Sequence, residues 1–223
     1  MSDAFYGQLD GTAPNSEFNA AHFHARQHAA RLRTGIPVKI IAVHGGGVGA
    51  PPTVDVQPLV NQVDSQGNST PHGIIYGIPV TRNQGGGNAI INDPNVNDVY
   101  HAVVADRDIS SLKNNAGAQS NPGSGRRHDL SDMVLHAAFL NPDAPTTYIN
   151  LNGGNVVIST TGAVTITSTG PVTINAPNLI VNGNIQATGS ITAGAGGGDS
   201  VGLQSHTHPT TPSGPEAAPT PGS

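Results

Sequence analysis

The chain has 223 residues, and its 9 Lys and Arg against 14 Asp and Glu give a net charge of −5. This acidic balance, without clustered basic residues, argues against nucleic acid as a partner. Only 10% of the residues are charged and 4% are aromatic, whereas 29 are Gly and 18 are Pro, so few side chains are available to fill a globular core. The absence of cysteine excludes disulfides and thiolate metal sites, which makes oligomerisation the expected source of stability.

Residues 1–35 are expected to form an extension with one helix. The first residues lack the basic and apolar regions of a signal peptide, and no apolar run in the chain approaches the roughly 20 residues that span a bilayer. Ser16 can cap a helix, because the segment after it contains no Gly or Pro. His22, His24 and His28 resemble a metal-binding spacing, but positions i, i+2 and i+6 do not share one helical face. A solvated or partner-facing helix is therefore preferred over a metal site.

Residues 36–148 have the short apolar runs of a small β-domain. Within Val54-Asp-Val-Gln apolar and polar residues alternate, as in a half-buried strand. Five strands in about 105 residues, separated by clusters of Gly, Pro and Asn, predict a small closed barrel of the OB type. The expected strands are residues 36–43, 53–60, 73–80, 99–106 and 134–140.

Two features of this region resemble catalytic or phosphate-binding motifs. His44-Gly-Gly-Gly-Val-Gly has the glycines of a phosphate loop but no following Lys-Ser/Thr, so a hairpin loop is the preferred interpretation. Asp106-Arg-Asp108 and Arg126-Arg-His-Asp129 carry acids and bases, but no nucleophile accompanies them at a recognisable spacing. Ion pairs that join the ends of loops are the expected role of these residues.

Residues 149–193 contain a repeat with a period of eight. Gly154-Asn-Val-Val-Ile-Ser is followed by Gly162-Ala-Val-Thr-Ile-Thr and by Gly170-Pro-Val-Thr-Ile-Asn. Each repeat predicts one strand of about five residues and one tight corner, with two apolar side chains on the same face. The side chains expected to form the core of a shared shaft are Val156, Ile158, Val164, Ile166, Val172 and Ile174.

A single eight-residue side cannot enclose a core, so the repeat predicts association between chains. Three chains that each supply one side would close a prism and bury the Val and Ile column along its axis, which predicts a homotrimer. The alternative is an ordinary sheet lying on the barrel, which would leave long sheet edges open to aggregation. The trimeric prism is the preferred interpretation.

Residues 194–223 form the expected apex and a tail rich in Pro and Gly. In an extended segment His206 and His208 project the same way, and a threefold axis would bring six imidazoles together. Six neutral nitrogens suit an octahedral transition metal such as iron(II), whereas zinc normally takes four ligands. The two histidines are therefore the candidate metal ligands, and one shared ion would tie the three chains.

The combination of an OB barrel, an octapeptide prism and a terminal His-x-His resembles the central spike, or membrane-piercing tip, of contractile-tailed bacteriophages. The resemblance covers about residues 36–209. Its motifs are Val54-Asp-Val-Gln-Pro-Leu, Val103-Val-Ala-Asp-Arg-Asp-Ile, Arg127-His-Asp-Leu-Ser-Asp and His206-Thr-His208. The resemblance implies a barrel that docks on the baseplate hub, a triple-stranded β-helix that points at the host, and one iron ion (Fe²⁺) per trimer held by six histidines. The chain departs from the family pattern by its long tail after His208.

The expected function is mechanical: sheath contraction drives the trimeric tip of the virion baseplate through the host outer membrane, without an active site. The protein would be made in the bacterial cytoplasm. One alternative is a tip enzyme that degrades cell wall or capsule, which would need two carboxylates at glycosidase spacing, and residues 153–182 contain none. A receptor-binding fibre is disfavoured because no aromatic residue follows Ile191. The spike of a related contractile secretion or bacteriocin system is a close alternative.

Overall fold

The computed structural model describes residues 15–64, 66–141, 143–196, 198 and 201–203. The chain divides into two units, residues 1–159 and residues 160–223, and each is described by itself. Strand exceeds helix, 32% against 12%, which confirms the predicted β class. Among the described residues no helix combines the length and the apolar character needed to cross a membrane.

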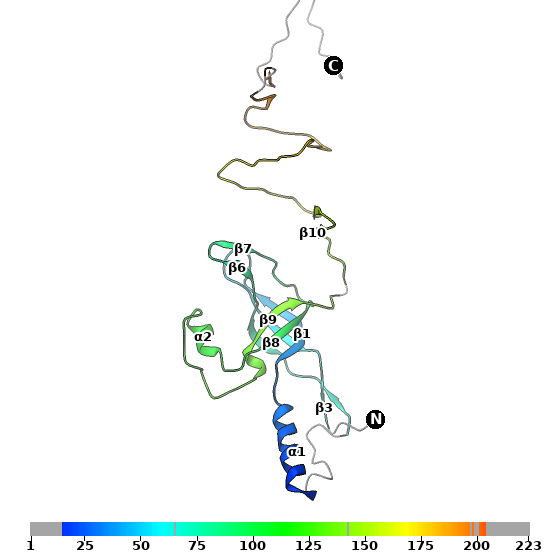
Figure 1. Cartoon of the computed structure of the whole chain (residues 1–223), viewed down its shortest axis with the longest axis vertical. Helices are drawn as coiled ribbons and strands as arrows, with labels where there is room; N and C mark the ends of the chain where they lie inside the picture. The colour runs from blue at the N-terminus through cyan, green and yellow to red at the C-terminus, as the bar shows by residue number, and fades with distance from the viewer. Residues whose placement is uncertain (1–14, 65, 142, 197, 199–200, 204–223) are drawn as a thin grey trace, which may run out of the picture. The chain divides into compact units, whose positions relative to one another are not determined.

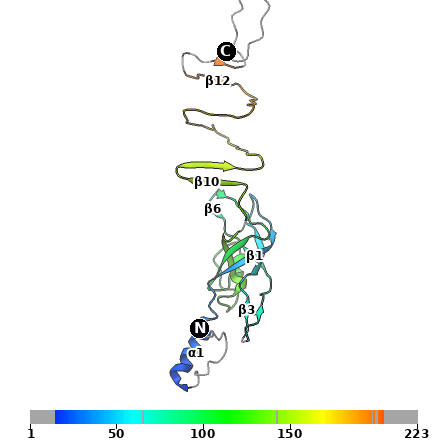
Figure 2. The same cartoon turned by 90° about the vertical axis from the view of Figure 1, so that its right-hand side faces the viewer.

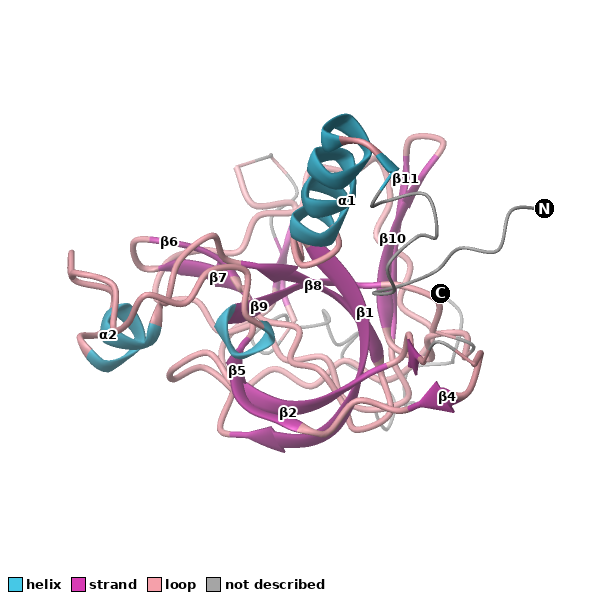
Figure 3. Cartoon of the chain, turned by 90° about the horizontal axis from the view of Figure 1, so that it is seen from below, coloured by secondary structure: helices cyan, strands magenta, loops and turns pink. Residues whose placement is uncertain are grey.

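The first unit contains a curled antiparallel sheet of five strands in the order β5-β2-β1-β8-β9 (Figure 3). All five strands lie where the sequence predicts them. Successive side chains of a strand point to opposite faces of the sheet. In β2, Val54 and Val56 are therefore buried, while Asp55 and Gln57 are partly exposed. The strands of the sheet are β1 (Gly35–His44), β2 (Thr53–Pro58), β5 (Ile75–Pro79), β8 (Val99–Val104) and β9 (Met133–Ala138).

The two edge strands of the sheet, β5 and β9, meet at one end. Val80 and Leu135 form a parallel bridge there, and the Thr81 amide donates to the Leu135 carbonyl at 2.9 Å. The sheet therefore curls round one apolar core instead of lying open. The buried apolar residues of that core are Val38, Ile40, Val54, Val56, Ile78, Val80, Tyr100, Ala102, Val104, Met133 and Leu135.

The contribution of the core to stability can be tested with two neighbouring isoleucines. Ile40 is fully buried, whereas Ile41, which lies at a break in the register of β1 with β2, is 38% exposed. We expect Ile40→Ala to lower the free energy of unfolding by about 3 kcal/mol, because it leaves a cavity in the core. Urea denaturation should show this loss, and Ile41→Ala should cost less than half as much. Equal losses would contradict the assignment of the inward face.

Helices and short strands lie outside the five-stranded sheet in the first unit (Figure 1). Helix α1 (Glu17–Ala29) begins as predicted at Ser16, whose hydroxyl accepts from the Asn19 amide at 3.1 Å. None of its residues is buried, and Phe18 is 76% exposed, so the helix is not packed into the apolar core of the first unit. The remaining elements are β3 (Gln62–Val63), β4 (Ser69–Thr70), β6 (Asn83–Gly85), β7 (Asn88–Ile90), α2 (Ser110–Asn114) and the 3-10 helix η2 (Leu130–Asp132).

The first unit ends in a β-hairpin formed by β10 (Tyr148–Asn152) and β11 (Asn155–Ser159) (Figure 2). Its turn consists of Gly153 and Gly154, both with positive φ, 58° and 82°. The two-residue turn that matches the twist of the flanking strands needs positive φ at both of its residues. Glycine adopts positive φ at little cost in free energy. The hairpin is thus specified locally by Asn-Gly-Gly-Asn.

The second unit has little regular secondary structure in its described residues. Residues 160–191 contain no hydrogen-bonded strand, and the trace runs back and forth between bends (Figures 1 and 2). The first bends fall at residues 161–162 and 169–170, eight residues apart, at the glycines that the repeat places at its corners. Beyond them, β12 (Thr192–Ala193) pairs with β13 (Val201–Gly202).

Candidate assembly surface and metal ligands

The apolar residues of the predicted shaft core are uncovered in the single chain. All six of them are between 62% and 76% exposed to solvent. Single exposed apolar residues are common on protein surfaces, but six at a fixed period amount to a repeated apolar pattern that water would have to hydrate. These side chains are candidates for burial against another chain. The first pair, Val156 and Ile158, lies in the first unit, and the pairs Val164 and Ile166 and Val172 and Ile174 lie in the second.

Residues 144–198, which we call the charge-free segment, contain no Asp, Glu, Lys, Arg or His. Exposed strands of soluble proteins usually carry charges, which prevent edge-to-edge association. A long uncharged segment is compatible with solubility when other chains cover it. The charged side chains lie before residue 144 or after residue 198. All nine Lys and Arg lie on the N-terminal side of the segment.

The structure adds two residues to this surface that the repeat does not identify. Ile149 and Leu151 lie in β10 directly opposite Ile158 and Val156 of β11, and they are 68% and 74% exposed. They precede the first repeat, so the eight-residue period misses them. The signal that identifies them is the two-glycine turn flanked by alternating apolar residues, which predicts a hairpin.

The candidate metal ligands His206 and His208 lie outside the described residues. Their chemistry fits a transition metal, because neutral imidazole nitrogens are common ligands of iron and zinc. Within the part of the chain that the structure describes, no group of three or more His, Cys, Asp or Glu could hold a metal ion. In α1, His22 stacks on Phe18 with ring centroids 6.1 Å apart.

The glycine-rich loop between β1 and β2 is a hairpin loop, as predicted, since His44 pairs with Thr53 across it. The Gly47 amide donates to the carboxylate of Asp93, and the Arg82 guanidinium binds the same carboxylate at 3.2 Å. Arg82 also donates to the Gly49 carbonyl at 2.9 Å. The loop amide that a phosphate would need is therefore occupied by a side chain of the protein.

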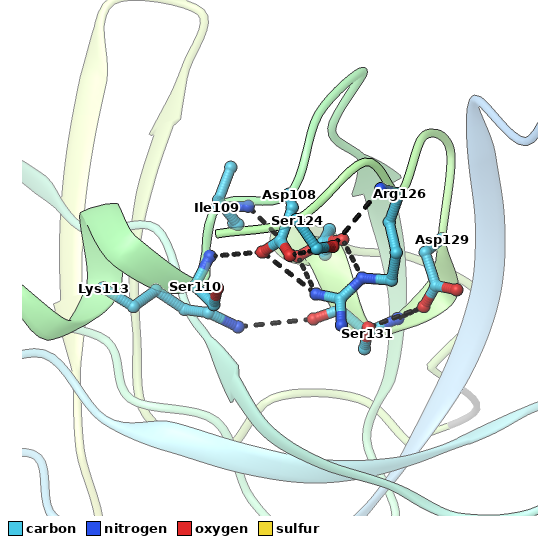
Figure 4. Close-up of polar contacts among 9 residues, drawn as sticks. Asp108, Ile109, Ser110, Lys113, Ser124, Arg126, Asp129 and Ser131 are labelled. Atoms are coloured by element: carbon cyan, nitrogen blue, oxygen red, sulfur yellow. Dashed lines mark hydrogen bonds and ion pairs between the residues drawn. The ribbon is translucent and has the colours of Figure 1, made fainter. Parts of the chain in front are cut away.

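A charge cluster of Asp108, Arg126 and Asp132 joins the two ends of the long loop between β8 and β9 (Figure 4). The Arg126 guanidinium lies 3.0 Å from the Asp108 carboxylate and 3.1 Å from that of Asp132, and both carboxylates are at least 95% buried. This confirms the predicted ion pairing between the loop ends, and it adds Asp132, for which the sequence predicted no ion pair. Asp132 also accepts from the Ile109 amide at 3.1 Å.

Hydrogen bonds stabilise the ionised form of two carboxylates in this loop. The pKa of Asp108 lies well below its ordinary value of 3.8, because Ser110 and Ser124 donate to the carboxylate and the Arg126 charge adds to their effect. The pKa of Asp129 is lowered by hydrogen bonds from Ser131. Both carboxylates are engaged by donors within the chain.

These lowered pKa values predict the effect of acid on the stability of the first unit. A carboxylate whose folded pKa lies below its unfolded pKa of 3.8 contributes stability above that pH, and the contribution is lost as the pH falls through the folded pKa. We expect the melting temperature to fall steeply below about pH 4. Asp108→Asn should be less stable at pH 7 and should lose less on acidification, as measured by thermal denaturation between pH 7 and pH 2. An unchanged acid dependence would contradict this role for Asp108.

A scan against protein-family models finds no match to the chain, and a search among curated proteins finds none either. The proposed function therefore has to come from the chain's own residues. Its two most distinctive features are the exposed apolar repeat and the charge-free segment.

Proposed function

We propose that the chain is the subunit of a homotrimeric spike at the tip of a contractile-phage baseplate, which pierces the host outer membrane when the sheath contracts. The observation that carries the proposal is the set of exposed Val and Ile residues at a period of eight within the charge-free segment. One chain leaves these side chains in water, whereas three chains that each supply one side would bury them in a common prism. The spike of a related contractile secretion or bacteriocin system would use the same architecture.

The five-stranded sheet is proposed to be an OB-type barrel that docks on the baseplate hub. The sheet order and the bridge between Val80 and Leu135 support a partly open five-stranded barrel. The barrel is stabilised by an apolar core and by the charge cluster, so it can transmit load without a conformational change. Helix α1 has no buried residue and remains available for the hub or for another partner.

The tip is proposed to be closed by one iron(II) ion per trimer, held by His206 and His208 of each chain. Six imidazoles around a threefold axis suit octahedral coordination. The ion would tie together three chain ends that have no cysteine with which to form a disulfide. No catalytic residue is needed for this role.

The mass of the purified protein in solution tests the proposal. We expect sedimentation equilibrium to give about three times the chain mass of 22.6 kDa at micromolar concentration. Immunogold labelling of contractile particles should then mark the distal end of the tail tube. A stable monomer would rule out the trimeric spike, and turnover of peptidoglycan or capsule by the purified protein would favour the alternative of a tip enzyme.

A further inference from the structure

The β10–β11 hairpin has one apolar face, which we call the hairpin face. Directly opposite residues of an antiparallel pair lie on the same side of the sheet, and so do residues two apart along a strand. The pairs Ile149 with Ile158 and Leu151 with Val156 therefore share one side. The other side carries Asn150 paired with Val157, together with polar neighbours. The hairpin face thus consists of Ile149, Leu151, Val156 and Ile158.

The described residues of the first unit do not cover this face. All four side chains are more than 60% exposed, and none belongs to the buried core of the barrel. Each strand of the hairpin pairs with the other and with no further described strand. A two-stranded hairpin by itself is at best marginally stable in water. A stable hairpin therefore requires something to cover its apolar face.

The distribution of charge indicates what that cover is. In a symmetric association each residue near the axis lies beside its own copies, so any charge there would meet like charges, which is unfavourable. A partner of different sequence imposes no such limit, and such interfaces usually have a polar rim with charged residues. The hairpin lies wholly within the charge-free segment, residues 144–198. The absence of charge on the hairpin face therefore favours identical copies of the chain as its cover.

We propose that the hairpin face packs against the same face of two other copies of the chain and forms the first layer of the trimer interface, in which β10 adds two apolar side chains to those of the first octapeptide. This inference rests on the proposed homotrimer and adds Ile149 and Leu151 to its interface. The tight Gly153–Gly154 turn fixes which residues of β10 and β11 stand opposite each other. The hairpin consequently presents the same four side chains at the same level in every chain, which sets the register of the three chains where the shaft begins.

Two asparagine substitutions on opposite sides of the hairpin test the proposal in the full-length protein. Leu151→Asn places an amide in the interface three times per trimer, and we expect it to raise the concentration at which trimers dissociate at least about tenfold. Val157→Asn, on the other side of the same hairpin, should change that concentration less than about twofold. Light scattering after dilution measures both. Equal effects of the two variants would overturn the proposal.

Single cysteines give a second readout, because the chain has none of its own. A disulfide requires Cα atoms about 4.4–6.8 Å apart, so it reports close approach of two copies. On oxidation, Leu151→Cys should give a covalent dimer and leave about one third of the chains uncoupled, since three thiols form only one pair. Asn150→Cys should remain uncoupled. Coupling of Asn150→Cys, or none of Leu151→Cys, would overturn the proposal.

The mass of the wild-type protein in solution distinguishes an error in the proposed homotrimer from an error in the role of the hairpin face. If the wild-type protein is a monomer, the homotrimer itself is wrong and the hairpin proposal falls with it. If the wild-type protein is a trimer but neither substitution nor cross-linking distinguishes the two sides of the hairpin, only the role of the hairpin face is wrong.

Discussion

Replacement of Ile166 by aspartate is expected to abolish the trimer. Ile166 is 76% exposed in the single chain, so a charge there does not disturb the chain's own core. In the proposed prism the same position faces the axis, and the substitution would bring three carboxylates together away from water. Burial of an unpaired charge costs several kcal/mol for each ion, and mutual repulsion adds to that cost. Sedimentation equilibrium should find a particle of one chain mass, 22.6 kDa.

The neighbouring residue provides the control. Thr165 is also exposed, and in the proposed prism, where alternate residues of an extended segment face opposite sides, it would face away from the axis. Thr165→Asp adds the same charge to the same repeat and should leave the mass unchanged. Ile166→Asn separates charge from size, because it is polar but uncharged, and it should weaken the trimer less than aspartate does. A persistent trimer in Ile166→Asp would show that this residue lies outside the shaft core.

The second large effect is expected at the histidines of the tail. Replacement of both His206 and His208 by Ala should reduce bound iron from one ion per three chains to none, because each chain then offers no imidazole at the apex. Elemental analysis of the purified protein measures this ratio. The melting temperature of the trimer should fall as well, because a ligand that binds only the assembled state stabilises it.

Helix α1 supplies the matched control for the loss of iron. His22 and His24 show the same i, i+2 spacing as the tail histidines, but they lie on a helix, where such residues do not share a face. Their replacement by Ala should leave the metal content unchanged. Iron that persists after loss of His206 and His208, or that disappears with His22 and His24, would contradict the assigned ligands.

The five strands of the sheet could be predicted from the sequence, because each has an internal signal. Alternation in Val54-Asp-Val-Gln identifies an inward and an outward face, and glycine-rich turns separate the strands. The start of α1 is similarly local, because Ser16 caps the helix through a contact three residues away. Local geometry determines both features, so neither depends on the rest of the fold.

Contacts that depend on the course of an irregular loop were harder to predict. Arg126 was expected to form an ion pair, but its second partner, Asp132, was not identified, because the six-residue spacing does not show that the chain turns back between them. Ile149 and Leu151 were missed because they precede the first octapeptide. The prism remains a prediction, since a single chain cannot show contacts that three chains would make.

The placement of charge in the chain also limits which proteases can act on it. Trypsin cleaves after Lys or Arg, and the last of these residues is Arg127, so residues 128–223 have no tryptic site even in the unfolded chain. Enzymes that select Asp or Glu find none within residues 144–198. Resistance of this segment to charge-selective proteolysis is therefore a property of its covalent structure, independent of folding or assembly.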